Sequence, residues 1–377
     1  MNSSTLAYKL RKLKFYALEF GFFWTLAKLC FAYKIRVPFY LLLYRPWRLR
    51  SKHTVGFVGC GGHSYTTLAL FIRLKTDANF VFALDTNSDA ANFFSKAYAI
   101  KHTCSDLNDL EKLRIRADVV YIASSHSTHA FYADHFSARG AKVYCEKPLA
   151  LTEDDYLSFQ KMQAEGRRIY SGYNRPHAPF IKYLSENVLK KNGREVFSMS
   201  CIVKGHKLSE DHWYRSAGEG SRVASNMCHW LDLFYYIYCN VTGNSTGRFR
   251  IDLAFNEAIS FPTDNMAITV SSERGDLFNL CFTSRNEPFE GVAEYIFFET
   301  SRHSVVLENF KRMRITQGFR RTKVSVFRRD RGHEMSVLQP FFSDHSGVSD
   351  SWLGSAKLIV KADAMLMTQQ RTGSVEI

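Results

Sequence analysis

The chain has 377 residues, 46% of them hydrophobic and 23% charged, which is typical of an ordered globular protein with room for two domains. The formal net charge is +14 at pH 7, yet residues 1–53 hold eleven Lys and Arg residues against one acid, Glu19, and so account for +10 of it. The body of the chain is nearly neutral, which argues against nucleic-acid binding by the fold itself.

The first 50 residues mix Lys and Arg with Phe, Tyr, Trp and Leu. Their uncharged runs, 20–27 and 37–44, are shorter than the roughly 20 residues of a membrane-spanning helix, and no small-residue cleavage site marks a secretory signal. Two interpretations stay open: the segment holds the protein on an anionic membrane surface, or it forms an extra helix packed on the body or on a partner. We expect a cytoplasmic protein, which under the first interpretation is peripheral on the inner face of the cytoplasmic membrane.

The eight cysteines stand singly along the chain, without a C-x-x-C pair. This usage suits a reducing compartment and argues against a disulfide framework. No group of Cys, His and Asp residues has the spacing of metal ligands, so we expect no bound metal.

Residues 54–174 alternate short apolar runs with segments that suit helices. This alternation predicts crossover connections and a parallel sheet with helices on both faces, the doubly wound fold of a Rossmann domain. The expected strands are 55–59, 80–85, 118–124, 142–145 and 168–173, and the expected helices are 63–76, 87–97, 126–138 and 152–165.

Longer strand-like runs dominate residues 175–345, which predicts an α+β domain built on an open, mainly antiparallel sheet. A last segment, 346–377, is expected to pack back on the body as a helix. The expected strands are 196–203, 250–255, 266–271, 277–283, 294–300 and 322–327, and the expected helices are 223–239, 334–344 and 352–370.

A glycine-rich loop follows the first expected strand and opens the first expected helix, with the sequence Gly59-Cys-Gly61-Gly62-His63-Ser64. It fits G-x-G-x-x-S, a dinucleotide-binding fingerprint with serine as its last small residue. Gly59 permits the tight turn, and Gly61 lets the backbone approach a pyrophosphate at the helix N-terminus. Its place at the head of a βαβ unit favours this interpretation over an ordinary glycine-rich turn.

An acidic residue, Asp85, ends the second expected strand, 24 residues after Gly61. A carboxylate at this place accepts hydrogen bonds from the ribose hydroxyls of an adenosine and repels a 2′-phosphate. Since no arginine follows to receive such a phosphate, the sequence favours NAD over NADP. The alternative is that Asp85 only caps the next helix.

Two further polar motifs follow expected strands, and they are Ser124-Ser125-His126-Ser-Thr-His129 and Glu146-Lys147-Pro-Leu. Together with the glycine loop, they resemble the Gfo/Idh/MocA family of NAD(P)-dependent oxidoreductases over roughly residues 54–370. The resemblance implies hydride transfer between a nicotinamide and a hydroxyl-bearing carbon of a sugar or polyol. It also implies that the three motifs bind the cofactor and that the open sheet of the second domain makes a homo-oligomer interface.

The resemblance places Lys147 beside the nicotinamide and the reacting hydroxyl, where an ammonium polarises a developing alkoxide. A second motif, Ser225-Asn226-Met-Cys-His229-Trp-Leu-Asp232, puts His229 and Asp232 on one helical face. The family usually has D-x-G-x-H-x-x-D here, with the first Asp and the His assisting the lysine, whereas this chain has Ser225. We expect Lys147 and His229 to be catalytic; the alternatives are a lysine in a surface turn and a core histidine bonded to Asp232.

Other stretches resemble a branch of the family found in bacterial surface-polysaccharide synthesis, namely 173–177, 211–213 and 330–334. Substrate contacts are expected from residues that follow the last Rossmann strand or that lie in and after the 211–213 loop. These residues are Asn174, Arg175, His212, Trp213 and Asp232. For each of them a packing or capping role stays open as the alternative. The expected substrate is therefore a sugar or nucleotide-sugar.

Two functions remain at this point. The first is an NAD(P)-dependent sugar oxidoreductase, favoured because Lys147 and His229 are both retained. The second is a catalytically impaired, cofactor-binding scaffold or sensor of the same fold, favoured by Ser225 in place of the usual aspartate.

Overall fold

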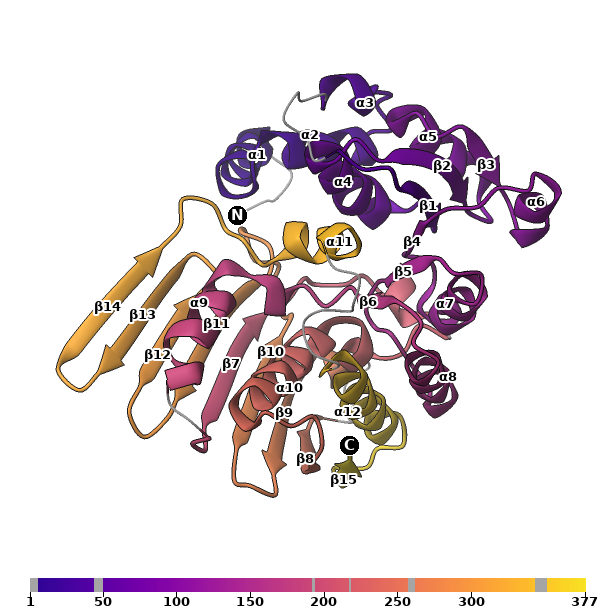
Figure 1. Cartoon of the computed structure of the whole chain (residues 1–377). Coiled ribbons are helices and arrows are strands. Elements are labelled where there is room, and N and C mark those ends of the chain that lie inside the picture. Colours follow the sequence, from indigo (N-terminus) through magenta and orange to yellow (C-terminus); the bar gives the residue numbers. More distant parts are fainter. Residues whose placement is uncertain (1–5, 44–49, 192–193, 217, 257–261, 343–350) are drawn as a thin grey trace.

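The computed structural model describes residues 6–43, 50–191, 194–216, 218–256, 262–342 and 351–377. These residues form two domains, each built on a sheet, and three helices that precede them in the chain (Figure 1). The expected fold class, a parallel Rossmann sheet joined to an α+β domain on a mainly antiparallel sheet, is confirmed.

The Rossmann domain has a six-stranded parallel sheet in the order β3-β2-β1-β4-β5-β6. Its inner strands are buried along almost their whole length, as expected for a sheet that helices cover on both faces. The strands are β1 (Thr54–Val58), β2 (Asn79–Leu84), β3 (His102–Cys104), β4 (Val119–Ile122), β5 (Lys142–Cys145) and β6 (Ile169–Ser171). The short edge strand β3 was not expected, because His-Thr-Cys is no apolar run.

Polar caps mark where the Rossmann helices begin. Thr152 and Asp155 form a capping box at α8, and Asn87 and Asp106 cap α5 and α6 through their side chains. The helices are η1 (Ser64–Leu68), α4 (Ala69–Lys75), α5 (Ser88–Tyr98), α6 (Leu107–Lys112), η2 (His126–Thr128), α7 (His129–Ser137) and α8 (Glu153–Ala164).

The second domain has a nine-stranded sheet in the order β14-β13-β12-β11-β7-β10-β9-β8-β15, in which β7 and β10 are parallel and the other neighbours antiparallel. Side chains alternate between a buried and a more exposed face, so helices cover one face only. The strands are β7 (Ser198–Lys204), β8 (Arg248–Ala254), β9 (Asn265–Ser272), β10 (Leu277–Thr283), β11 (Ala293–Glu299), β12 (Ser304–Glu308), β13 (Arg312–Gln317), β14 (Arg320–Ser325) and β15 (Thr372–Glu376).

The C-terminal segment differs from expectation. Its helix, α12 (Ser351–Met367), does pack back on the body, against α8 and α10, but the chain then continues as β15 and pairs with β8. The remaining helices are η3 (Arg175–His177), α9 (Pro179–Asn187), η4 (Leu189–Lys191), η5 (Trp213–Arg215), η6 (Val223–Met227), α10 (Cys228–Thr242), η7 (Pro262–Asp264) and α11 (His333–Phe342). The expected segment boundary at 345–346 lies outside the described residues.

The N-terminal helices α1 (Leu6–Phe20), α2 (Phe22–Ala32) and α3 (Phe39–Leu42) pack on both domains. Ala27, Cys30 and Phe39 are fully buried in the same core cluster as the first Rossmann helix. Glu19 at the end of α1 forms ion pairs with Lys311 and Arg329 of the second domain. The segment is therefore packed on the body, and within the described ranges each helix is too short or too polar to cross a membrane.

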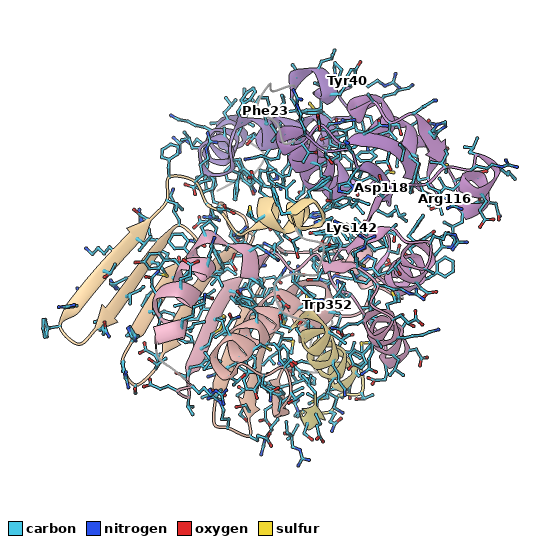
Figure 2. The ribbon with its side chains drawn as sticks, viewed as in Figure 1. Phe23, Tyr40, Arg116, Asp118, Lys142 and Trp352 are labelled. Carbon is cyan, nitrogen blue, oxygen red and sulfur yellow. The ribbon has the colours of Figure 1, made fainter. Side chains whose placement is uncertain are left out.

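Helix α3 provides a test of this packing. Phe39 is fully buried between Tyr65 and Tyr98, whereas the adjacent Tyr40 is 38% exposed at the edge of the molecule (Figure 2). Phe39→Ala should lower the free energy of unfolding by about 3–5 kcal/mol, measured by urea denaturation. Tyr40→Ala, the control, should change it by about 0.5 kcal/mol or less. Equal stability of the two variants would mean that α3 is not part of the folded core.

Candidate active site

The glycine loop, residues 59–64, has the geometry of a pyrophosphate cradle. Gly59 has φ +85°, and a Cβ there would lie 2.4 Å from the Ala123 carbonyl oxygen, so no side chain fits. Gly61 faces open space, with no atom within 4 Å of the place of a Cβ. The Ser64 hydroxyl donates to the Gly59 carbonyl at 2.5 Å and closes the turn. The loop leaves room for a phosphate at the start of the first helix.

Asp85 lies directly beside this loop. Its Oδ2 accepts a hydrogen bond from the Cys60 amide at 2.7 Å, and its Oδ1 accepts one from the Asn87 amide at 2.8 Å. The cap of the next helix is Asn87, whose Oδ1 accepts from the Ala90 amide at 3.1 Å. Asp85 is therefore free of the capping role and half-buried where the ribose of a bound adenosine would lie.

The motif after β4 contacts both the E-K-P-L motif and the second domain. The His129 ring lies 2.7 Å from the Pro148 carbonyl and 3.2 Å from that of Ser124. His126 is buried, its amide donates to Glu219 at 3.0 Å, and burial lowers its pKa to about 3. Ser124 is half-buried and Ser125 exposed at the same edge of the sheet. The two histidines thus fix the loop on which the serines are displayed.

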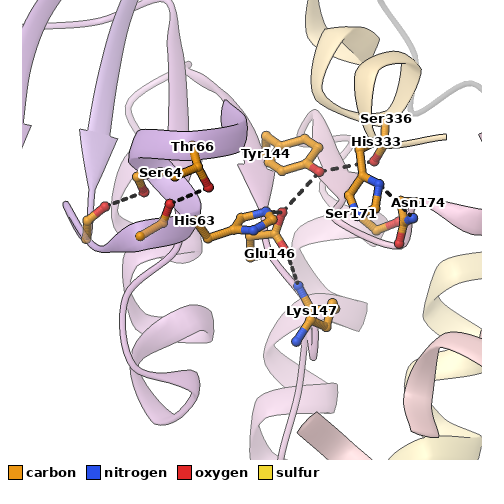
Figure 3. Close-up of polar contacts among 12 residues, drawn as sticks. His63, Ser64, Thr66, Tyr144, Glu146, Lys147, Ser171, Asn174, His333 and Ser336 are labelled. Carbon is orange, nitrogen blue, oxygen red and sulfur yellow. Dashed lines mark hydrogen bonds and ion pairs between the residues drawn. The ribbon is translucent and has the colours of Figure 1, made fainter. Parts of the chain in front are cut away.

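Glu146 is the centre of a hydrogen-bond network between three elements (Figure 3). Its Oε1 lies 2.9 Å from His63 Nε2 and accepts from the Tyr144 hydroxyl at 3.3 Å, and that hydroxyl bonds Ser336 of α11 at 3.1 Å. Burial alone would raise the pKa of Glu146, but His63 and Lys147 lower it to about 2. Glu146 therefore stays ionised and keeps the glycine loop, β5 and α11 together.

Lys147 points into a cavity between the two domains, of about 210 Å³, here called the Lys147 cavity. Its Nζ donates to the Ser225 carbonyl at 2.9 Å and to the Tyr214 hydroxyl at 3.2 Å. Burial alone would lower the pKa of Lys147, but Tyr214, Cys228 and Glu146 raise it above the usual value. The side chain is a charged group of an interdomain cavity and not part of a surface turn.

His229 lines the same cavity, and its Nδ1 has no hydrogen-bond partner among the described residues. Burial, together with the nearby cations Arg175 and Lys147, holds its pKa well below the usual value, so the ring is neutral near pH 7. Asp232 is 2% exposed and accepts instead from the Ser355 hydroxyl of α12 at 2.7 Å. Asp232 therefore braces α10 against α12 and does not line the cavity.

Ser225, the residue in the place of the usual aspartate, lies in the π-helical turn η6. It is fully buried and offers Lys147 its backbone carbonyl, while the adjacent Asn226 lines the cavity. The Oδ1 of Asn226 accepts from Arg222 Nε at 3.1 Å. A neutral amide and a backbone carbonyl thus surround Lys147 on this side.

The two residues after β6 have different environments. Asn174 lines the Lys147 cavity, and its Nδ2 donates to the Arg331 carbonyl at 2.7 Å. Arg175 is 4% exposed, bonds Glu294 at 2.9 Å and lies over the ring of Trp230. Arg175 joins the Rossmann domain to the second sheet and is placed away from the cavity.

His212 and Trp213 line a larger cavity of about 720 Å³, here called the Trp213 cavity, which shares Tyr214 and Asn226 with the Lys147 cavity. Trp213 is 49% exposed, so its ring is available for stacking. A third cavity, of about 760 Å³, lies between α2, the first Rossmann helix and residues 328–334, and shares His63 with the Lys147 cavity.

The structure brings together five predicted residues around the Lys147 cavity: His63, Glu146, Lys147, Asn174 and His229. The other seven lining residues were not predicted, and they include Tyr214 and His333. Both belong to or directly follow stretches that resemble the family branch, but nothing local indicates that they meet Lys147. Within the described ranges, no three His, Cys, Asp or Glu residues are grouped to hold a metal ion.

The glycine loop with Asp85 beside it, and the lysine in an interdomain cavity, are arranged as a dinucleotide-binding Rossmann domain would require. Residues 53–173 match the model of the Gfo/Idh/MocA oxidoreductase family, NAD-binding Rossmann fold. Over these residues the resemblance to that family and the expected NAD cofactor are confirmed.

Known relatives agree with this assignment. The inositol 2-dehydrogenase of Gluconacetobacter diazotrophicus is 30% identical over 188 residues, which are 48% of this chain and 53% of that protein. The inositol 2-dehydrogenase/D-chiro-inositol 3-dehydrogenase of Shouchella clausii is 24% identical over 186 residues, 48% of this chain and 52% of that protein. The matched region thus spans about half the length of these curated relatives.

Solved structures share the fold over most of the chain. An oxidoreductase from Agrobacterium radiobacter in complex with NAD+, L-tartaric acid and magnesium has a TM-score of 0.69 and 15% identity, covering 86% of this chain and 98% of that one. A UDP-N-acetylglucosamine 3-dehydrogenase from Acidithiobacillus ferrooxidans has a TM-score of 0.65 and 16% identity, covering 84% and 97%. At such identities the likeness establishes the fold alone.

The place of Asp85 predicts how the protein selects its cofactor. Asp85→Ser should narrow the preference for NAD(H) over NADP(H), because it removes repulsion of the 2′-phosphate. Dissociation constants for both cofactors, measured by calorimetry, test this expectation. Asp89→Ser, which removes an exposed acid of α5, should leave the preference unchanged. Tighter binding of NADP(H) than of NAD(H) by the unaltered protein would contradict the role of Asp85.

Proposed function

We propose that the protein is an NAD-dependent dehydrogenase or reductase acting on a hydroxyl-bearing carbon of a sugar or nucleotide-sugar. The observation that carries the proposal is the Lys147 ammonium, which points into an interdomain cavity at the carboxyl end of β5 together with His229. The carboxyl ends of Rossmann strands are where the nicotinamide of a bound dinucleotide lies. The named activities of the curated relatives, all inositol dehydrogenases, support a polyol or sugar as substrate.

The glycine loop would hold the pyrophosphate of NAD, and Asp85 its adenosine ribose. When bound, the nicotinamide supplies the hydride acceptor or donor. Lys147 remains protonated and donates a hydrogen bond to the substrate oxygen, stabilising the charge that develops there. His229, neutral and with a free Nδ1, is the hydrogen-bonding group that orients the same hydroxyl. The domain interface around the cavity limits access of water.

The Trp213 cavity gives the substrate room beyond the reacting carbon. Trp213 and His212 offer ring faces, and their cavity continues from the Lys147 cavity past Tyr214. Carbohydrate rings stack on such aromatic faces through their C–H groups. A nucleotide-sugar used in surface-polysaccharide synthesis is our proposed substrate, supported by the resemblance of 173–177, 211–213 and 330–334 to that branch of the family and by the named activity of one structural neighbour.

Lys147→Met tests the catalytic assignment. The variant keeps a side chain of similar length but removes the charge, and the rate should fall about 100- to 1,000-fold with NAD binding retained. NADH absorbance at 340 nm with sugars and nucleotide-sugars gives the rate, and calorimetry gives NAD binding. A fully active Lys147→Met variant would refute the assignment. An unaltered protein that binds NAD but turns over no sugar would favour the scaffold or sensor alternative.

We further infer that the protein binds an anionic membrane surface peripherally through its N-terminal helices. One side of α1 packs on the body, and the exposed side carries Leu6, Leu10 and Leu18, exposed by 72%, 55% and 52%, together with the exposed cations Lys9, Arg11 and Lys14. Phe22 at the start of α2 is exposed by 64%. This mixture of exposed apolar and cationic side chains suits binding between acidic lipid headgroups.

Vesicle sedimentation tests the membrane surface. The unaltered protein should bind vesicles of phosphatidylglycerol and phosphatidylcholine, less so at high salt, and Leu10→Glu with Phe22→Glu should bind at least about tenfold more weakly. Phe319→Glu, which alters a 98% exposed residue between β13 and β14, is the control and should bind normally. Equal vesicle binding by all three proteins, or none by any, would contradict the inference.

The open face of the second sheet supports the expected homo-oligomer. Ile202, Leu277 and Phe297 lie on neighbouring strands and are exposed by 46%, 38% and 36%. Apolar side chains on a sheet face without helices favour burial against a second copy of the chain. We propose this face as the interface of a dimer.

A further inference from the structure

The loop before the His229 helix brings a tyrosine hydroxyl to Lys147. Lys147 Nζ donates to Tyr214 Oη at 3.2 Å and lies 5.4 Å from the centre of its ring. Tyr214 is half-buried and lines both the Lys147 cavity and the Trp213 cavity. The phenol of Tyr214 therefore stands between the Lys147 cavity, where the reacting hydroxyl would lie, and the larger Trp213 cavity, from which it can exchange protons with water.

The other groups around Lys147 are poorly suited to accept the proton of a substrate hydroxyl. Lys147 is held in its charged form by its neighbours. His229 has its pKa well below the usual value, because burial and the cations Arg175 and Lys147 oppose an imidazolium there. The carboxylate that the family usually places in this helix is absent, since Ser225 takes its position.

Three further lining groups are also poorly suited to accept this proton. Burial lowers the pKa of His333 to about 3, and the ionised Glu146 is paired with His63. The Tyr144 hydroxyl donates to Glu146 and bonds Ser336. Among the described residues that line the cavity, Tyr214 is the remaining hydroxyl within hydrogen-bond distance of Lys147 Nζ.

We propose that Tyr214 is a catalytic residue that exchanges the proton of the reacting hydroxyl, with Lys147 stabilising its phenolate. The inference rests on the proposed oxidoreductase function and deepens it. In the direction of oxidation, the substrate O–H bond breaks and the proton passes to the phenolate oxygen of Tyr214. The C–H bond electrons leave as hydride to NAD+, so a C=O bond forms and NADH results. In reduction, Tyr214 returns the proton to the oxygen as the hydride arrives.

Most side chains around Tyr214 are cationic or neutral. Lys147 contacts its hydroxyl, and the rings of His126 and His212 lie with their centres 5.6 and 5.1 Å from its own. Arg222 lines the Trp213 cavity and Arg215 follows Tyr214 in the sequence, and both pair with the carboxylate of Asp264. A second carboxylate, Glu287, also lines this cavity and is hydrogen-bonded to His206. A phenolate at this position gains attraction from Lys147 and Arg222, while both nearby carboxylates have partners of their own.

The Tyr214→Phe variant tests the proposal because it keeps the ring and its contact with Lys147. With NAD+ and myo-inositol or UDP-N-acetylglucosamine as probes, whichever the unaltered enzyme oxidises, kcat should fall at least 100-fold with NAD binding unchanged, since a general acid–base group contributes about 100- to 10,000-fold. Tyr183→Phe, a half-buried tyrosine of α9, is the control and should retain full activity. Full activity of Tyr214→Phe would overturn the proposal. If only Lys147→Met loses activity, the proposed oxidoreductase function still stands.

A second measurement needs no substrate. 3-Fluorotyrosine placed at position 214 reports its ionisation through the 19F chemical shift as pH is varied with NAD bound. In the Lys147→Met background, the pKa of that fluorophenol should rise by about one unit or more, because the stabilising charge is gone. An unchanged titration would show that Lys147 does not stabilise the phenolate and would overturn the proposal even if both probes fail as substrates.

Discussion

The hydrogen bond between His63 and the buried carboxylate of Glu146 ties the glycine loop to the segment that carries Lys147. A carboxylate out of contact with water keeps its charge only when cations and donors surround it. Glu146 meets this condition through His63, Lys147 and Tyr144, and each partner comes with its own segment of backbone. The position of Lys147 in the interdomain cavity depends on this network, and the bond from Tyr144 to Ser336 extends it to α11.

A second buried charge, Glu294 of β11, joins the domains in the same manner. Arg175, which follows the last Rossmann strand, and Arg331, which precedes α11, both pair with it. Because Glu294 is buried, the loss of either arginine would leave an uncompensated charge and lower the free energy of unfolding. The two ion pairs therefore hold the two domains together at this point. Tyr214 and His229, which belong to the second domain, thereby face Lys147 of the first across the Lys147 cavity.

Much of the fold could be predicted, because apolar runs and turn residues mark each inner Rossmann strand and the E-K-P-L motif ends β5. Strands β13 and β15 could not, since Arg and Thr in the first and a Gly-Ser pair in the second dilute their apolar pattern. Strand β12 was missed although it holds the short apolar run Val-Val-Leu. The cofactor motifs are local and were found by spacing. Tyr214 could not be, because it lies in an irregular loop 67 residues from Lys147 and only tertiary packing brings them together. Asp232 shares a helix with His229 but faces α12 instead of the cavity. The three-residue spacing of the two in the sequence does not reveal this difference.

The packing of α1 has a consequence for the synthesis of the chain. Glu19 leaves the ribosome before its partner Lys311, which lies 292 residues later. Until Lys311 is made, α1 has no second domain to pack on, and its apolar residues are exposed to solvent, chaperones or a lipid surface. Contacts of such long sequence separation form slowly, because the intervening loop must close first. Helix α1 is thus made before the domain that fixes its final place.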